Sequence, residues 1–157
     1  MNRTFLASAV AVLTLTAPAL TGHAAEPVQV GSLEIEAPWA RASVGTMRPS
    51  AAYMVIRNGG DEPERLLRVE TPAAGHAELH ATVTEGDMMR MRPAEGLEIP
   101  PGGELRLEPG GLHVMLMHLH EPLEEGASLP MTLVFERAGE VTIETPIAAL
   151  GASSAPD

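Results

Sequence analysis

The sequence of 157 residues contains no cysteine and no lysine. Without a thiol the chain can form neither a disulfide framework nor a thiolate metal site, and this excludes a blue-copper electron-transfer centre. All ten basic residues are arginine, against 21 acidic residues, which gives a formal net charge of −11. This charge argues against binding to nucleic acid or to an anionic membrane. It suits solubility, attraction of cations or a basic partner, and does not choose among them.

The N-terminal residues follow the plan of a secretory signal peptide, which we predict to span residues 1–24. Arg3 precedes an apolar run from Phe5 to Leu20, and small residues then mark a cleavage site before Ala25, with cutting after Ala25 as the alternative. The run is short for a membrane span, and no cysteine follows it to carry a lipid. We therefore expect an exported, periplasmic protein with no membrane insertion after cleavage, and an uncleaved anchor is the alternative.

The remainder of the chain predicts one all-β domain over residues 25–149, followed by a short disordered tail at 150–157. Short runs rich in Val, Ile, Leu and Thr alternate with Gly, Pro and Asp turn signals, and no stretch shows a capped helical period. This pattern favours a Greek-key β-sandwich or barrel. The expected strands cover residues 28–36, 51–57, 66–70, 76–84, 88–92, 97–99, 104–108, 112–117, 129–136 and 140–145.

Four soft donors stand at distinctive spacings: His80, ten residues, Met91, twenty-one residues, His113, one residue, Met115. A single Met is most often a flexible core filler and a single His a satisfied polar residue. Two imidazoles with two thioethers, however, form a donor set that suits Cu(I), whereas calcium and magnesium require oxygen and zinc prefers thiolate, imidazole or carboxylate. The set therefore favours carrying copper over passing electrons.

Strand alternation allows these donors to meet, because side chains two residues apart share a face. His113, Met115 and Met117 then share one face, Met89 and Met91 another, and His76, Glu78 and His80 a third. Three strands can thus offer ligands to one site near the surface.

The same spacing resembles the signature of the PCu(A)C family of periplasmic copper chaperones. Four segments of the chain are also similar in sequence to that family: Ala37–Arg41, Ala52–Tyr53, Met89–Pro93 and Pro109–Met117. The resemblance implies a cupredoxin-like β-sandwich that binds Cu(I) through His80, Met91, His113 and Met115. It also implies that the protein supplies copper for the dinuclear copper centre of cytochrome c oxidase, with the copper-bearing subunit or a thiol-containing assembly factor as partner.

The sequence departs from that family at two points. Thr82 stands where many relatives carry a methionine, and the tail lacks the His- and Met-rich extension of some relatives. A second copper site would have to use His76, His118 or His120, and we expect the latter two to be solvated loop histidines beyond the end of a strand.

Catalysis is not expected. The serines lack a nucleophile-elbow context, the carboxylates are scattered, and no Gly-rich phosphate loop is present. Two other functions remain open beside the chaperone, which we expect to be a monomer: a copper buffer or resistance protein that only sequesters Cu(I), and a structural adhesion-type sandwich whose histidines and methionines are incidental.

Overall fold

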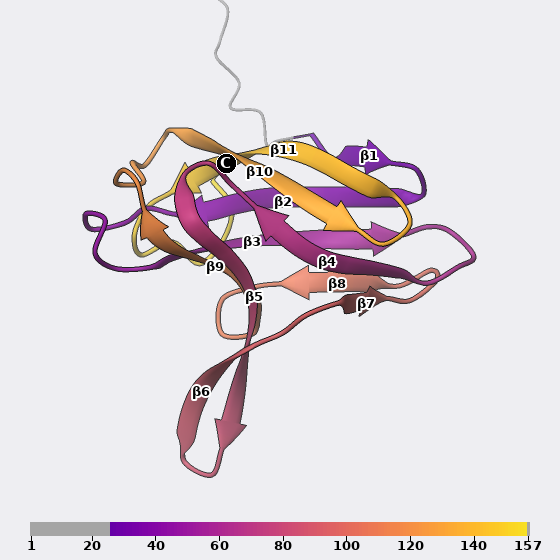
Figure 1. Cartoon of the computed structure of the whole chain (residues 1–157), viewed down its shortest axis with the longest axis horizontal. Helices are drawn as coiled ribbons and strands as arrows, with labels where there is room; N and C mark the ends of the chain where they lie inside the picture. The colour runs from indigo at the N-terminus through magenta and orange to yellow at the C-terminus, as the bar shows by residue number, and fades with distance from the viewer. Residues whose placement is uncertain (1–25, 157) are drawn as a thin grey trace, which may run out of the picture.

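The computed structural model describes residues 26–156, so the predicted signal peptide lies outside the described residues. Over that range the chain forms strands and turns without a helix, which confirms the predicted all-β class, and no helix there could span a membrane. The strands, shown in Figure 1, are β1 (Val28–Val30), β2 (Leu33–Arg41), β3 (Ser50–Asn58), β4 (Glu64–Glu70), β5 (Ala74–Glu85), β6 (Met88–Pro93), β7 (Leu97–Ile99), β8 (Glu104–Leu107), β9 (Leu112–Leu119), β10 (Ser128–Phe135) and β11 (Gly139–Ala148).

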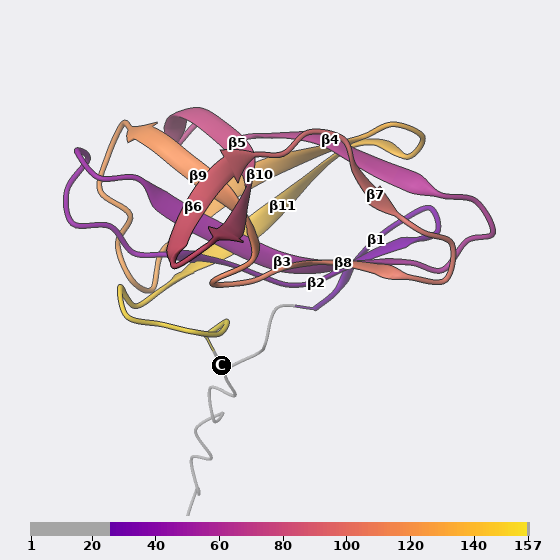
Figure 2. The ribbon, with the colours of Figure 1, turned by 90° about the horizontal axis from the view of Figure 1, so that it is seen from below.

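The strands form a two-layer sandwich whose layers are joined through β11. Their pairing order is β6-β5-β9-β8-β3-β2-β11-β10-β4-β7, with β1 added to β2. Most of β11 pairs antiparallel with β10, whereas its last two residues, Ile147 and Ala148, pair in parallel with Ala40 and Arg41 of β2. Figure 2 shows β4 along the upper side of the sandwich and β2, β3 and β8 along the lower side.

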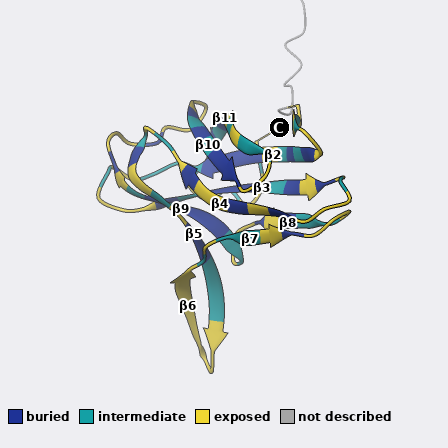
Figure 3. Ribbon diagram, turned by 45° about the vertical axis from the view of Figure 1, so that its right-hand side comes forward, coloured by how far each residue is buried: buried dark blue, intermediate teal, exposed yellow. Residues whose placement is uncertain are grey.

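The core lies between the two layers and is built from the inward residues of each strand. Ile35, Ile56 and Leu116 from the first layer meet Met131 and Leu133 from the second, and all five are fully buried. Each such side chain stabilises the fold by about 1.5–3 kcal/mol through removal of apolar surface from water. Figure 3 shows this buried interior and, in contrast, the exposed β6.

The first predicted strand, 28–36, is wrong in its extent, because the chain turns within it and a strand continues beyond it. Gly31 has a φ of 60° and lies in the turn between β1 and β2. Ala37 has a φ of 45°, and the pairing of β2 with β3 shifts between Glu36 and Trp39. Pro38 falls within this irregularity, where no ladder hydrogen bond is required of its nitrogen.

The C-terminal segment, expected to be a disordered tail, contacts the sandwich in the structure. Ala152 and Ala155 pack on a small cluster formed by Trp39, Tyr53 and Ala148. Arg41 Nη2 donates a hydrogen bond to the Ala152 carbonyl at 2.9 Å. Small side chains suffice here because the two aromatic rings supply the apolar surface.

The β5–β6 hairpin extends away from the body of the sandwich (Figure 1). Its loop consists of Gly86 and Asp87, and Gly86 has a φ of 64°, which a two-residue hairpin loop favours. All six residues of β6 are exposed. The hairpin therefore belongs to the sheet by its hydrogen bonds and contributes little to the core.

Candidate metal centre

The four predicted donors lie on one face of a three-stranded ladder in which β5 is central. His80 of β5 is directly opposite His113 of β9, and Glu78 is opposite Met115. On the other side of β5, Thr82 is opposite Met91 of β6. Directly opposite residues share a face, as do residues two apart, so the register brings all four donors to the same side of the sheet.

The two imidazoles are close enough to bind one ion. Their ring centroids are 5.9 Å apart, and the rings are inclined by 45°. A metal–nitrogen bond of about 2.0–2.1 Å places the ring centroid about 3.2 Å from the metal, so two rings on one ion have centroids at most about 6.4 Å apart. Both residues are buried, with 9% of His80 and 5% of His113 exposed.

Hydrogen bonds leave one nitrogen free on each ring. His113 Nδ1 lies 3.0 Å from the Gly111 carbonyl and therefore donates its hydrogen there, which leaves Nε2 with a lone pair. His80 Nε2 lies 3.1 Å from Glu78 Oε2, and its Nδ1 is buried without a hydrogen-bond partner in residues 26–156. A buried acceptor without a partner is costly, so a bound metal ion would satisfy it. An outer partner that fixes the tautomer is the usual arrangement of metal-binding histidines.

The two thioethers differ in how far they are exposed. Met91, His113 and Met115 line one open cleft of about 650 Å³, together with Met89. His80 does not line this cleft and lies against His113 behind it. Met115 is half-buried on β9, whereas 58% of Met91 is exposed on the projecting hairpin. A larger cleft of about 820 Å³, around Pro122 and Leu129, contains none of the four donors.

One wall of the cleft is formed by the two segments Ala37–Arg41 and Ala52–Tyr53, whose sequences resemble the family but contain none of the four donors. The rings of Trp39 and Tyr53 are in contact, with centroids 4.5 Å apart and planes inclined by 39°, and the Arg41 guanidinium lies 5.6 Å from the Tyr53 ring centre. Burial raises the pKa of the Tyr53 hydroxyl, and the positive charge of Arg41 opposes this rise in pKa. Arg41 and Tyr53 both line the cleft, so these matched segments support the site.

The remaining histidines lie away from the donor pair. His118 belongs to β9, with a φ of 54°, so the expectation that it follows the strand in a loop is wrong. Its ring contacts that of exposed His76 edge to face, with centroids 5.4 Å apart. His120 Nδ1 donates to the Pro72 carbonyl at 2.9 Å. In the described part of the chain no three His, Cys, Asp or Glu residues are grouped to hold a metal ion.

The sequence did not single out the hydrogen-bond partners of the two histidines, which are the Glu78 carboxylate for His80 and the Gly111 carbonyl for His113. Strand alternation placed Glu78 on the same face as His80, so a contact between the two side chains could have been predicted. The contact of the Gly111 carbonyl could not have been predicted from the sequence, because only the turn before β9 brings this carbonyl to His113 Nδ1.

The chain is similar to known proteins over most of its length. A family model described as "Putative lipoprotein LpqE-like" matches residues 33–147. A protein named "Putative lipoprotein Lxx21020", from Leifsonia xyli subsp. xyli, is 32% identical over 120 residues, which cover 76% of this chain and 71% of that protein.

Solved structures are similar over a comparable range. The copper-bound PCuAC domain from PmoF2 is 31% identical with a TM-score of 0.69, and the match covers 80% of this chain and 99% of that chain. The Cu(I) form of DR1885 from Deinococcus radiodurans is 32% identical with a TM-score of 0.60, covering 85% of this chain and 87% of that chain.

Proposed function

The chain belongs to the LpqE-like family of PCuAC-type proteins, with their cupredoxin-like fold, and on this premise we propose that it is an exported carrier of Cu(I). Two of the similar structures are described as copper-bound or Cu(I)-bound. The family is described as lipoproteins, which supports action outside the cytoplasm, and we place this chain in the periplasm.

The observation that carries the proposal is the pair of histidines whose free nitrogens accompany two thioethers on one sheet face. His113 Nε2 and His80 Nδ1 supply two neutral nitrogens, and Met91 and Met115 supply two neutral sulfurs. Thioether sulfur binds soft ions, so this set selects Cu(I) over zinc, calcium or magnesium. The chain would act by carrying the ion, with no catalytic step.

The same arrangement suits release of the ion. The site contains no thiolate, and neutral donors hold Cu(I) less firmly than a pair of cysteine thiolates would. Met91 lies exposed on a hairpin outside the core, so an acceptor's ligand can replace it while His80, His113 and Met115 still hold the ion. We propose that the acceptor carries cysteine ligands, as does the copper-bearing subunit of cytochrome c oxidase or its thiol-containing assembly factor. The alternative is a buffer that sequesters copper without transferring it.

X-ray absorption of the loaded protein tests the donor set. We expect one Cu(I) per chain, with sulfur and nitrogen scatterers together in the first shell and much weaker binding of zinc. A shell of nitrogen and oxygen alone would contradict the proposal.

Replacement of single thioethers separates ligation from packing. Met91→Leu and Met115→Leu should each lower the Cu(I) affinity about tenfold or more, because leucine keeps the volume and removes the sulfur. An anaerobic titration against a competing Cu(I) chelator measures the affinity. Met131→Leu is the matched control, since Met131 is fully buried between the layers and should leave the affinity unchanged. Equal losses at Met91 and Met131 would mean that the sulfur of Met91 does not bind copper.

A further inference from the structure

The cleft beside the donors has the opposite charge to the rest of the molecule. Three arginines line it, Arg41, Arg48 and Arg90, and no aspartate or glutamate does. The chain as a whole has 21 acidic residues and a net charge of −11. A surface with this composition, on a protein with so many carboxylates, is a local region of positive potential.

Two of these arginines lack an acidic partner within the described residues. Of the nine arginines between residues 26 and 156, seven lie within 4.0 Å of a carboxylate, and the two that do not are Arg41 and Arg48. Arg41 instead donates to the Ala152 carbonyl and covers the Tyr53 ring. Arg48 is exposed. Its charge is therefore available to a molecule that approaches the cleft.

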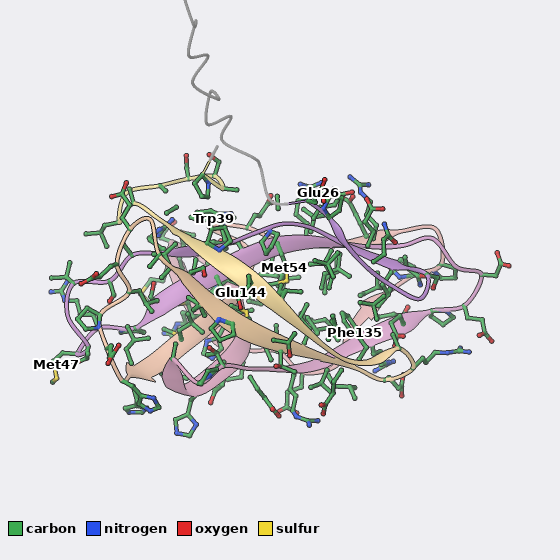
Figure 4. The ribbon with its side chains drawn as sticks, turned by 90° about the horizontal axis from the view of Figure 1, so that it is seen from above. Glu26, Trp39, Met47, Met54, Phe135 and Glu144 are labelled. Carbon is green, nitrogen blue, oxygen red and sulfur yellow. The ribbon has the colours of Figure 1, made fainter. Side chains whose placement is uncertain are left out.

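Exposed apolar side chains are concentrated on the three segments that contribute residues to this cleft, and Val44, Met89, Met91 and Leu150 line it directly. Seven large hydrophobic side chains are exposed in the described part of the chain, and six of them lie on the 42–49 loop, the β5–β6 hairpin or the C-terminal segment: Val44, Met47, Met88, Met89, Met91 and Leu150. The exception is Leu67, the least exposed of the seven. Figure 4 shows Met47 at the tip of its loop, pointing away from the body, with 93% of the residue exposed. Gathered exposed apolar residues indicate an interaction site.

We propose that this rim, formed by Val44, Met47, Arg48, Met89, Arg90 and Leu150, is a docking surface for an acceptor protein with acidic residues around an apolar centre. Methionine and arginine are both enriched in protein interfaces, and an exposed methionine adapts to the partner's shape. Arg48 and Arg90 on this rim, with Arg41 in the wall of the cleft beside them, attract carboxylates and fix the orientation of the partner. The inference rests on the proposed function, because docking here places the partner's ligands beside Met91, His113 and Met115.

Ionic strength sets the range over which charges on the chain act on the partner. At 0.15 M salt the Debye length is about 8 Å, so the distant carboxylates of the molecule are largely screened and the cleft arginines act at contact. An acidic partner can therefore bind this acidic chain, because it contacts the local positive charge of the cleft. A basic partner would meet Arg48 and Arg90 at the rim and be repelled there.

Binding of two synthetic peptides to the metal-free protein tests this surface without copper. Both peptides carry a central Leu-Ser-Leu-Leu-Ser segment, flanked by four glutamates in one and four lysines in the other. At 0.15 M salt, NMR titration should show that the glutamate peptide binds at least fivefold more tightly and shifts the signals of Val44, Arg48 and Met89. Equal or tighter binding of the lysine peptide, or shifts elsewhere, would overturn the proposal.

Variants locate the effect. Arg48→Glu and Met47→Ser should each reduce binding of the glutamate peptide severalfold, because both side chains are exposed and neither supports the core. Arg68→Glu, on β4 in the other layer, changes the net charge by the same amount as Arg48→Glu and should leave binding unchanged. Equal losses in Arg68→Glu and Arg48→Glu would reduce the effect to net charge and contradict a local surface.

Transfer then joins docking to function. The same peptides with cysteine in place of serine accept Cu(I), and the second-order transfer rate should follow the binding preference, with Arg48→Glu slowing transfer to the glutamate peptide while the Cu(I) affinity stays constant. A protein that binds the peptides but no Cu(I) would refute the proposed function and keep the docking surface. A protein that loads Cu(I) but shows no preference between peptides would refute the docking surface alone.

Discussion

Replacement of His113 by asparagine is expected to abolish stable Cu(I) loading, with the affinity falling by at least about 100-fold. His113 is buried, lies next to His80 and lines the cleft, and in the proposed site its free ring nitrogen is a ligand. Loss of an outer partner of a metal ligand already costs about 10–100-fold in affinity, and loss of the ligand itself should cost more. Chelator competition measures the change.

His120→Asn is the control for this experiment. His120 is exposed, is held by the Pro72 carbonyl and lies outside the cleft, so the same substitution there should leave the affinity unchanged. Thermal unfolding of the metal-free variants shows whether both remain folded. A change of less than threefold in a folded His113→Asn variant would mean that copper binds elsewhere.

The largest effect on stability is expected at Glu64, which has no part in the metal site. Its carboxylate is buried and accepts three backbone N–H groups, from Arg65 at 2.8 Å, Arg137 at 3.0 Å and Ala138 at 2.8 Å. Glu64→Ala would leave all three donors without this partner, the N–H of Arg65 in β4 and those of Arg137 and Ala138 in the β10–β11 turn. We expect the free energy of unfolding to fall by about 2–5 kcal/mol, since each orphaned donor costs up to about 1–3 kcal/mol.

Urea unfolding measures this loss, and Glu70→Ala provides the comparison. Glu70 is an exposed carboxylate paired with Arg68 at 2.7 Å, and such surface pairs contribute about 0–1 kcal/mol. If the two variants lose the same small amount of stability, the buried carboxylate is not holding the turn. Neither variant should change the Cu(I) affinity in the folded protein.

Alternation of side chains allowed the donor faces to be predicted, but it could not give the pairing of the strands. The period of two assigns His80, Met91, His113 and Met115 to faces of their own strands. That β5 pairs with both β6 and β9 is a long-range fact, set by how the core packs. The hydrogen bonds that leave one ring nitrogen free on each histidine depend on this pairing, and they could therefore not be predicted from the sequence.

Local backbone exceptions explain the errors in the strand bounds. Ala37 and His118 both adopt positive φ values, which non-glycine residues rarely do, so neither position carries a compositional signal. The contacts of the C-terminal segment could not be foreseen for another reason: its small residues carry no packing signal of their own, and the Trp39 and Tyr53 rings provide the surface on which Ala152 and Ala155 lie. In that case the deciding residues lie about a hundred positions away in the chain.

The position of β6 at the end of the pairing order bears on self-association. Its outer backbone groups have no strand partner among the described residues, and an open edge of this kind invites a strand from another copy and, in crowded solution, aggregation. Arg90 and Arg92 place charge on this edge and Pro93 ends it with a residue that cannot donate a ladder hydrogen bond. These residues disfavour pairing of β6 with β6 of another copy, so the strand that carries Met91 stays accessible.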